Sequence, residues 1–266
     1  MILQRIKKTI FLGLLIGIPF TSMAWGLLGH RIVGQIADSY LTKHSRKEIF
    51  KILGTESIAM ASNWPDFIKS DPSFSYLSPW HYCDIKGGLS AAAVKNFLDA
   101  DTSVDAYTKI NFLVAQLKNK DLAGDNKVLF LRLLIHIVGD IHQPLHVGRP
   151  EDQGGNKIRV LWFRDTVNLH QVWDDRLINY QQLSYTEYVN AINFTTKDQR
   201  SAWQAEPLSD WIWQSYQLAE NIYSGVKQPY QKLEYRYNFD YINLLNQQLL
   251  KGGVHLAGLL NEIFDN

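Results

Sequence analysis

Cysteine is almost absent from this chain of 266 residues, which contains only Cys83. A single cysteine cannot form a disulfide within the chain, so the fold must be stabilised by a hydrophobic core or by bound metal. The chain also lacks internal repeats, low-complexity tracts and long linkers rich in proline, serine or glycine. With 46% hydrophobic and 12% aromatic residues, it can bury the core of one large domain.

The first 24 residues have the three parts of a cleavable signal peptide. Three basic residues precede an apolar run from Ile10 to Phe20, and a small-x-small pattern ends at Ala24. An uncleaved anchor helix is the alternative, but the run is shorter than the roughly 20 apolar residues that a bilayer requires. We therefore predict a signal peptide at residues 1–24, export to the periplasm or the medium, no membrane anchor after cleavage, and a mature chain that begins with Trp25.

The charge of the mature chain is close to balanced. Cleavage removes three basic residues and no acidic residue, which leaves 24 basic against 26 acidic residues and a net charge of −2. Such a chain has no overall positive field to attract nucleic acid. Any affinity for phosphate must therefore come from a local site, such as a metal cluster.

Apolar residues recur with helical periodicity along most of the chain. Helices are expected over about 33–40, 104–119, 126–142, 203–224 and 238–264. Only residues 156–163 alternate like a strand, and the two glycines before them suit a turn into a short hairpin. The predicted fold is mainly α, with one helical domain over residues 25–266 and a short β-hairpin.

Side chains that can bind metal follow one stripe of the helix expected over 126–142. His136 and Asp140 continue a stripe that begins with two leucines, and they lie at i and i+4. Such a pair has its β-carbons about 5 to 6 Å apart, close enough to share one metal ion. Pro144 then turns the chain, so that His146 can return towards the same place. His142 lies on another face of the helix and is left out of the expected ligands.

Three further segments carry candidate ligands: His170 and Asp174 at i and i+4, Asp66 after Trp-Pro, and His81 directly after a tryptophan. Taken singly, an aspartate after proline is usually a helix cap, and a histidine beside tryptophan is usually a packed core residue. Five of the eight histidines, however, lie in these segments and in 129–146. The combination favours a metal centre.

In this order and combination, the motifs resemble those of the zinc-dependent S1/P1 nucleases. The chain has W-x4-H from Trp25 to His30, then W-x-D, W-H-aromatic-x-D, H-x3-D-x2-Q-P-L-H, G-G-N and N-L-H-x2-W-D. The resemblance covers residues from Trp25 to about Ile178, and a weaker similarity is found at 252–264. With one cysteine and a single glycosylation sequon at Asn193, the chain is more similar to bacterial secreted members than to eukaryotic ones.

The resemblance implies three bound zinc ions. It assigns the first ion to Asp66, His81, His136 and Asp140, the second to His30, a bridging Asp140 and the amine and carbonyl oxygen of Trp25, and the third to His146, His170 and Asp174. Signal cleavage would then create a ligand, because an amide nitrogen is a poor metal donor. The set contains no thiolate, which suits open catalytic zinc better than a closed structural site.

The resemblance also implies a reaction. Two zinc ions would activate a water that attacks phosphorus, the third would stabilise the leaving 3′ oxygen, and Asp66 would orient the nucleophile. Single-stranded RNA and DNA would be cut to 5′-phosphorylated products, and nucleotides would be substrates of a 3′-nucleotidase activity; no stable protein partner is implied. Tyr82 matches the residue that stacks on the base, and Asp84 matches the carboxylate at the base edge. Lys69 is either a phosphate contact or a solvated surface lysine.

Two other functions remain open. Zinc phospholipases C share the N-terminal tryptophan, a similar helical three-zinc core and phosphodiester cleavage, so the implied fold is phospholipase C/P1 nuclease-like in either case. They are expected to carry glutamate where this chain has Asp174. A non-catalytic domain that metal only stabilises would need no open coordination position, and metal-dependent turnover of a phosphodiester would exclude it.

Overall fold

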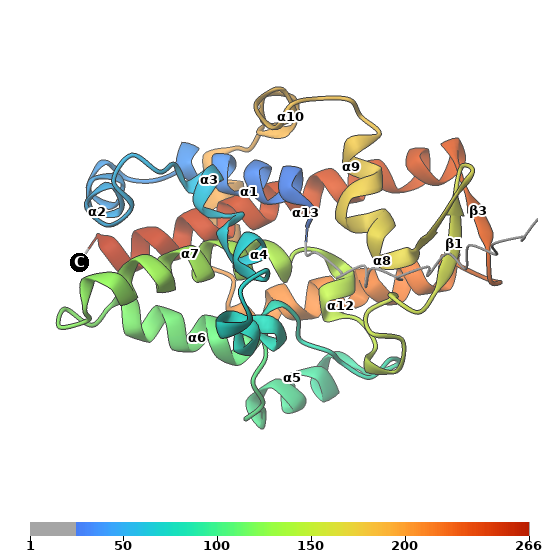
Figure 1. Ribbon diagram of the computed structural model, residues 1–266, viewed down its shortest axis with the longest axis horizontal. Coiled ribbons are helices and arrows are strands. Elements are labelled where there is room, and N and C mark those ends of the chain that lie inside the picture. The colour runs from blue at the N-terminus through green and yellow to red at the C-terminus, as the bar shows by residue number, and fades with distance from the viewer. Residues whose placement is uncertain (1–24, 266) are drawn as a thin grey trace, which may run out of the picture.

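A computed structural model describes residues 25–265, and helices make up most of this part of the protein (Figure 1). The mainly α fold class is therefore confirmed. The predicted signal peptide, residues 1–24, lies outside the described residues. Among residues 25–265, none of the helices combines the length and the apolar character that crossing a bilayer requires.

The elements follow one another along the chain as a series of helices interrupted by one small sheet. The α-helices are α1 (Leu27–Ser39), α2 (Lys43–Leu53), α3 (Ile58–Ala61), α4 (Trp64–Ile68), α5 (Ala91–Asp99), α6 (Ala106–Leu117), α7 (Gly124–Asp140), α8 (Leu169–Gln171), α9 (Leu177–Asn179), α10 (Tyr185–Ile192), α11 (Lys197–Gln204), α12 (Leu208–Gly225) and α13 (Tyr235–Phe264). Segments of 3₁₀ helix span Pro72–His81, Pro144–Val147 and Pro150–Asp152, and a π-helical turn spans Val172–Arg176. The strands are β1 (Arg159–Trp162), β2 (Asp165–Asn168) and β3 (Gln231–Leu233).

The helices α1, α7 and α13 pack against one another in the middle of the molecule (Figure 1). On α1, Ile32, Val33 and Ile36 are buried at the spacing of one helix face. Where α13 crosses α1 it carries Gly253, and a β-carbon at this position would collide with Ile36. The glycine thus permits a close approach of the two helices, which fixes α1 and the histidine it carries.

The expectation of one helix over 203–224 is wrong. α11 ends at Gln204, and α12 begins at Leu208. Pro207 lies between them in an extended conformation, with φ −70° and ψ 156°. Proline has no N–H and disfavours helical conformation at the residue before it, so the chain turns here. The turn allows α12 to pack against the 3₁₀ segment Pro144–Val147.

The prediction of a hairpin at 156–163 is incomplete, because the sheet has a third strand. β1 pairs antiparallel with β2, with Arg159 opposite Asn168, and β3 pairs parallel with β1, which gives the order β2-β1-β3. β3 has three residues, too few for an alternating pattern to be recognised. On β1, Val160 and Trp162 are buried and Arg159 is exposed, so one face of the sheet packs on the core and the other faces solvent.

Candidate metal centre

The C-terminal end of α7 supplies two adjacent donor groups. His136 and Asp140 lie one turn apart and are fully buried. Gly139 leaves room for another ring beside them, because a β-carbon at this position would lie 2.9 Å from Nδ1 of His30. His30 comes from α1, and its ring stacks on that of His136 with centroids 3.9 Å apart. Glycine is unfavourable inside a helix, but here it lets two helices bring their histidines together.

Asp140 connects these histidines to two further elements. Its Oδ1 lies 3.3 Å from Nε2 of His30. Its Oδ2 lies 3.3 Å from Nε2 of His136 and 3.0 Å from Nδ1 of His81, which ends the 3₁₀ segment after α4. Asp66, in the first turn of α4, approaches His30 and His136 to 4.0 and 3.8 Å. These five side chains form one continuous group, which we call the first cluster.

A second cluster consists of His146, His170 and Asp174, all buried. Nε2 of His170 lies 3.4 Å from Oδ2 of Asp174, and Nε2 of His146 lies 3.8 Å from its Oδ1. The amide of Gln143 donates a 2.6 Å hydrogen bond to the same Oδ1 and orients the carboxylate. His146 also donates from Nδ1 to the carbonyl oxygen of His81, so the two clusters are neighbours. The turn after Pro144 therefore brings its histidine back towards α7, as the sequence suggests.

Hydrogen bonds fix which ring nitrogen carries the proton in three of the histidines. The Nδ1 atoms of His136, His146 and His170 each donate at 2.6 Å to a backbone carbonyl oxygen, those of Ser62, His81 and Gly154. Burial lowers the pKa of each of these rings, to about 4 for His136 and for His146. The rings are therefore neutral, and each Nε2 bears a lone pair.

Two of these lone pairs face each other. The Nε2 atoms of His146 and His170 lie 3.1 Å apart, and neither carries a proton. Such an arrangement is repulsive unless a cation lies close to both nitrogens. A metal ion is the cation that neutral imidazoles bind most commonly, and Asp174 supplies a carboxylate at the same point. The second cluster therefore has the donor set of a zinc site.

The first cluster contains buried polar atoms that have no hydrogen-bond partner. They are both ring nitrogens of His30, Oδ2 of Asp66 and Oδ1 of Asp140. An unpaired buried polar group costs about 1–3 kcal/mol, so such atoms are rare. Nitrogen and carboxylate oxygen are ordinary zinc donors. The unpaired atoms of the first cluster thus also fit the metal that the sequence motifs imply.

Burial shifts the carboxyl groups of both clusters towards their neutral forms. It raises the pKa of Asp140 well above its usual value, and the nearby Asp66 raises it further. It raises the pKa of Asp174 to about 7, against the opposing effects of His170 and of the hydrogen bond from Gln143. A bound dication favours the ionised carboxylates instead. Metal binding would therefore stabilise the charges that this part of the fold otherwise disfavours.

Trp25 lies beside α1 and α7, close to Gly29 and Gly139. Its side chain is fully buried, and its Cδ1 would lie 3.8 Å from a β-carbon at Gly139. The next residue, Gly26, donates from its backbone N–H to the carbonyl oxygen of Asp174 at 2.7 Å. A β-carbon at Gly26 would lie 2.9 Å from Cβ of Asp175. The chain that follows Trp25 is thus held tightly against the turn that carries Asp174.

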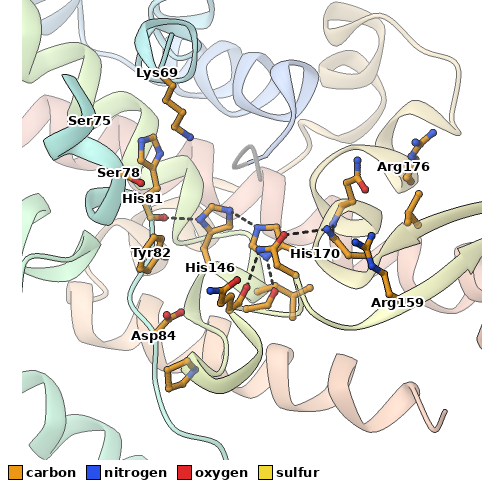
Figure 2. A pocket seen from close by; sticks show the side chains of 18 of the residues that line it. Lys69, Ser75, Ser78, His81, Tyr82, Asp84, His146, Arg159, His170 and Arg176 are labelled. Atoms are coloured by element: carbon orange, nitrogen blue, oxygen red, sulfur yellow. Dashed lines mark hydrogen bonds between the residues drawn. The ribbon is translucent and has the colours of Figure 1, made fainter. Parts of the chain in front are cut away.

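The clusters border a cleft of about 1010 Å³, which Figure 2 shows from close by. Three residues expected to contact substrate line it: Lys69, Tyr82 and Asp84. Tyr82 exposes 39% of its surface. Burial raises the pKa of Asp84 to about 6, and the negative charge of Asp152 adds to the shift. The structure therefore brings the predicted substrate contacts and the cluster histidines to one cavity.

Lys69 is paired with one of the candidate metal ligands. Its Nζ lies 2.5 Å from Oδ1 of Asp66, and its side chain is 26% exposed. Lys69 is thus partly exposed and held by an ion pair, and its contact with substrate stays a prediction. Lys69 lines the same cavity as His81 and His146 (Figure 2).

The sequence motifs missed two arginines in the wall of the cleft, Arg159 and Arg176. Arg159 stands on β1, and Arg176 ends the π-helical turn that carries Asp174. No local pattern marks Arg159 as a cleft residue, because its position depends on how the sheet packs. For Arg176 the sequence does contain a signal of a cleft position, because it lies two residues after the candidate ligand Asp174.

A mainly α domain whose buried histidines and aspartates meet beside an open cleft has the layout of a metal-dependent hydrolase. The family model for S1/P1 nuclease matches residues 25–265, and the chain belongs to this family. The family is zinc-dependent and its members cleave phosphodiester bonds, so the protein is a hydrolase of this class and a nuclease. The prediction of the family and of the enzyme class is confirmed.

Individual relatives support the same assignment. Endonuclease 4 of Arabidopsis thaliana is 30% identical over 277 residues, which cover 92% of this chain and 91% of that protein. Nuclease P1 of Penicillium citrinum is 26% identical over 266 residues, covering 90% of this chain and 97% of that one. Nuclease S1 of Aspergillus oryzae is 30% identical over 160 residues, 58% of this chain and 54% of that one.

Proposed function

We propose that the protein hydrolyses single-stranded RNA and DNA to 5′-phosphorylated products and removes phosphate from 3′-nucleotides, using three zinc ions. The observation that carries the proposal is the convergence of neutral imidazole lone pairs and buried carboxylates beside the cleft. Each of the three His/Asp groups that meet within 4.8 Å is fully buried: His30, Asp66 and His136; His81, His136 and Asp140; and His146, His170 and Asp174.

The geometry supports a bridging role for Asp140. Its Oδ1 faces His30, and its Oδ2 faces His136 and His81. One carboxylate can therefore serve two ions, one on each side. On this proposal the first ion is held by Asp66, His81, His136 and Asp140, the second by His30, Asp140 and the amine and carbonyl oxygen of Trp25, and the third by His146, His170 and Asp174.

The protein's own groups position the reaction. When bound, zinc would lower the pKa of a water molecule and stabilise the negative charge on the phosphate oxygens. The hydrogen bonds from Nδ1 of the histidines to backbone carbonyls hold the rings in a single orientation. Asp66 is placed to orient the nucleophile, and the Nζ of Lys69 beside it is placed to attract a phosphate oxygen.

On this proposal, the base binds on the side of the cleft that carries Tyr82 and Asp84. A partly exposed tyrosine ring can stack on any base, and such stacking requires a base that is not paired in a duplex. The carboxylate of Asp84 accepts hydrogen bonds from base N–H groups when it is ionised. This combination favours single strands and gives little sequence preference.

Export would complete the site. On this proposal residues 1–24 are a signal peptide, the mature protein is periplasmic or extracellular, and cleavage frees the amine of Trp25. The buried position of Trp25 beside Gly139, and the anchoring of Gly26 on Asp174, support a ligand role for this end of the mature chain. Secretion would then also activate the enzyme.

The test is to incubate purified mature protein with single-stranded RNA, single-stranded DNA, duplex DNA and phosphatidylcholine, with and without a chelator. We expect both single strands to be cut to fragments with 5′ phosphates, duplex DNA to be cut much more slowly, and the chelator to stop all cleavage. Turnover of phosphatidylcholine alone would indicate a phospholipase C. Bound zinc without turnover of any substrate would indicate a non-catalytic domain, and either result would overturn the proposal.

A further inference from the structure

The wall of the cleft opposite Tyr82 and Asp84 carries two guanidinium groups. Figure 2 shows Arg159 and Arg176 on one side, Tyr82 and Asp84 on the other, and the histidines of the second cluster between them. We call Arg159 and Arg176 the arginine wall. Neither the residues assigned above to the base, Tyr82 and Asp84, nor Lys69, assigned to a phosphate oxygen, belong to this wall.

Both arginines are held on rigid elements next to the second cluster. Arg159 on β1 pairs across the strands with Asn168 on β2, two residues before His170. Arg176 lies at the end of the π-helical turn, two residues after Asp174. The fold therefore sets the distance between the arginine wall and the second cluster, without a flexible loop between them.

The charges of the arginine wall are available to a ligand. Arg159 is exposed, and its side chain forms no ion pair with any residue in the part of the chain that the structure describes. Arg176 forms two ion pairs: Nη1 lies 3.7 Å from Oδ2 of Asp165, and Nε lies 3.5 Å from Oδ1 of Asp175. Its Nε makes no hydrogen bond. Within residues 25–265, Arg159 thus has no carboxylate partner, and Arg176 has two ion pairs but no hydrogen bond to a carboxylate.

The two ends of the cleft thus have opposite chemistry. At one end, the carboxylate of Asp84 would repel a phosphate and accept hydrogen bonds from the N–H groups of a base. At the other end, the two arginines match the charge and the geometry of phosphate oxygens. The cleft volume of about 1010 Å³ is at the upper end of the range of roughly 300–1,000 Å³ for pockets that hold one small ligand. Both ends belong to this one cleft.

We propose that Arg159 and Arg176 form a second phosphate-binding subsite, which binds the neighbouring phosphate of a polynucleotide on the side of the scissile phosphate away from Tyr82. This inference rests on the proposed nuclease function and deepens it. The arginine wall makes a strand a better substrate than a mononucleotide, because only a strand carries a second phosphate. It contributes to KM for strands and not to the chemical step.

The experiment compares wild type with the double variant Arg159→Gln/Arg176→Gln on two substrates, a single-stranded oligonucleotide of about ten residues and a 3′-mononucleotide. Arg164→Gln is the matched control, because Arg164 lies in the turn of the same hairpin, is exposed and does not line the cleft. For the double variant we expect KM for the oligonucleotide to rise at least about fivefold, with mononucleotide hydrolysis unchanged. The salt dependence of kcat/KM for the oligonucleotide should also weaken, by a slope of about 0.7 for each phosphate that the arginines no longer neutralise.

The outcomes separate failure of the subsite from failure of the proposed function. If wild type with zinc hydrolyses neither substrate, the proposed function is wrong, and the proposed subsite is wrong as well. If wild type is active and the double variant matches it on the oligonucleotide, the subsite alone is wrong. Equal losses on both substrates, or an equal loss in Arg164→Gln, would also overturn it, because they indicate support of the metal centre or a general charge effect.

Discussion

Two sets of buried histidines lie near the C-terminal end of α7, and their ring nitrogens are satisfied in opposite ways. His142, two residues beyond the helix, donates from Nδ1 to the carbonyl oxygen of Val138 and accepts at Nε2 from Nδ1 of His255, both at 2.7 Å. Nε2 of His255 lies 3.4 Å from a carboxylate oxygen of Glu206. The ring of Trp211 stacks on that of His255 with centroids 4.4 Å apart. Between His142 and His255 a donor therefore faces an acceptor, whereas Nε2 of His255 makes no hydrogen bond within residues 25–265.

In the two clusters beside the cleft, several ring nitrogens have no proton partner among the residues that the structure describes. Nε2 of His146 faces Nε2 of His170, and unpaired nitrogens of His30 lie beside an unpaired oxygen of Asp140. Burial alone does not distinguish the two regions, since all of these side chains are almost fully buried. The contact between the rings of His142 and His255 is a hydrogen bond, whereas the contact between the rings of His146 and His170 leaves two lone pairs facing each other.

Removal of metal should have the largest effect. Treating the mature protein with a chelator should abolish nuclease activity and lower the melting temperature, because ligand burial and folding are coupled. Each ion present at a hundred times its Kd adds about 2.7 kcal/mol of stability. Activity assays and thermal unfolding, before and after zinc is restored, provide the measurement. A chelated protein with unchanged activity would contradict the account.

A pair of substitutions compares the two regions directly. Asp140→Ala should lower the zinc content by more than one equivalent, because its carboxylate faces two histidine sets. His142→Ala should keep the full zinc content and lower the free energy of unfolding by about 1–3 kcal/mol, because it leaves His255 unpaired in the core. Metal analysis measures the zinc content of both variants, and chemical denaturation measures their free energy of unfolding. Equal zinc loss in both would show that His142 is also needed for metal binding, which contradicts the comparison.

Changing the N-terminus of the mature chain tests whether the amine of Trp25 is a zinc ligand. Protein that retains one extra residue before Trp25 should lose one zinc ion and most activity, because residue 25 then offers only an amide nitrogen. Proteolytic trimming to a free Trp25 should restore both. Trp25→Ala with a correctly cut N-terminus should retain more activity than the extended protein, since it loses only the packing of the indole. A fully active extended protein with its complete zinc content would refute the role of the amine.

How far the sequence predicts this site depends on how local each signal is. His136 and Asp140 follow from helical spacing, because positions i and i+4 adjoin in any α-helix. Asp66 and His81 are ambiguous alone, since a helix cap and a packed core histidine have the same local sequence. Only the family motifs single out these residues and His30, and the fold then brings His30 to 4.0 Å from Asp66 and His81 to 3.0 Å from Asp140.

The features that the sequence did not predict depend on contacts between distant segments. β3 is a strand because it adds to β1, not because of its own three residues. Arg159 lines the cleft because the buried Val160 and Trp162 fix which face of β1 packs on the core. The break between α11 and α12 is a local signal that was available, since Pro207 disfavours helix at the residue before it.

A smaller effect is expected on the base side of the cleft. Tyr82→Ala should weaken the binding of single strands by about 1–3 kcal/mol, because a stacking surface is removed. Hydrolysis of a phosphodiester without a base should change little. The measurement is the ratio of kcat/KM for the two substrates in wild type and variant. An equal loss on both would mean that Tyr82 supports the metal clusters instead of the base.

The smallest effect should be a pH dependence caused by Asp84. Its pKa is raised to about 6 by burial, so the carboxylate that accepts from a base N–H is present above this pH and is lost below it. KM for a nucleotide should fall by about two- to tenfold as pH rises from 5 to 7. Asp84→Asn should remove this change. A variant with the same pH profile as wild type would assign the effect to another group.

Counting the ions on intact protein measures whether the buried imidazoles and carboxylates beside the cleft bind three zinc ions. Native mass spectrometry of mature protein that begins at Trp25, after equilibration with zinc and removal of excess metal, should show three ions per chain. His170→Ala should show two, and His142→Ala should still show three. One ion or none in protein that is active as a nuclease would contradict the account.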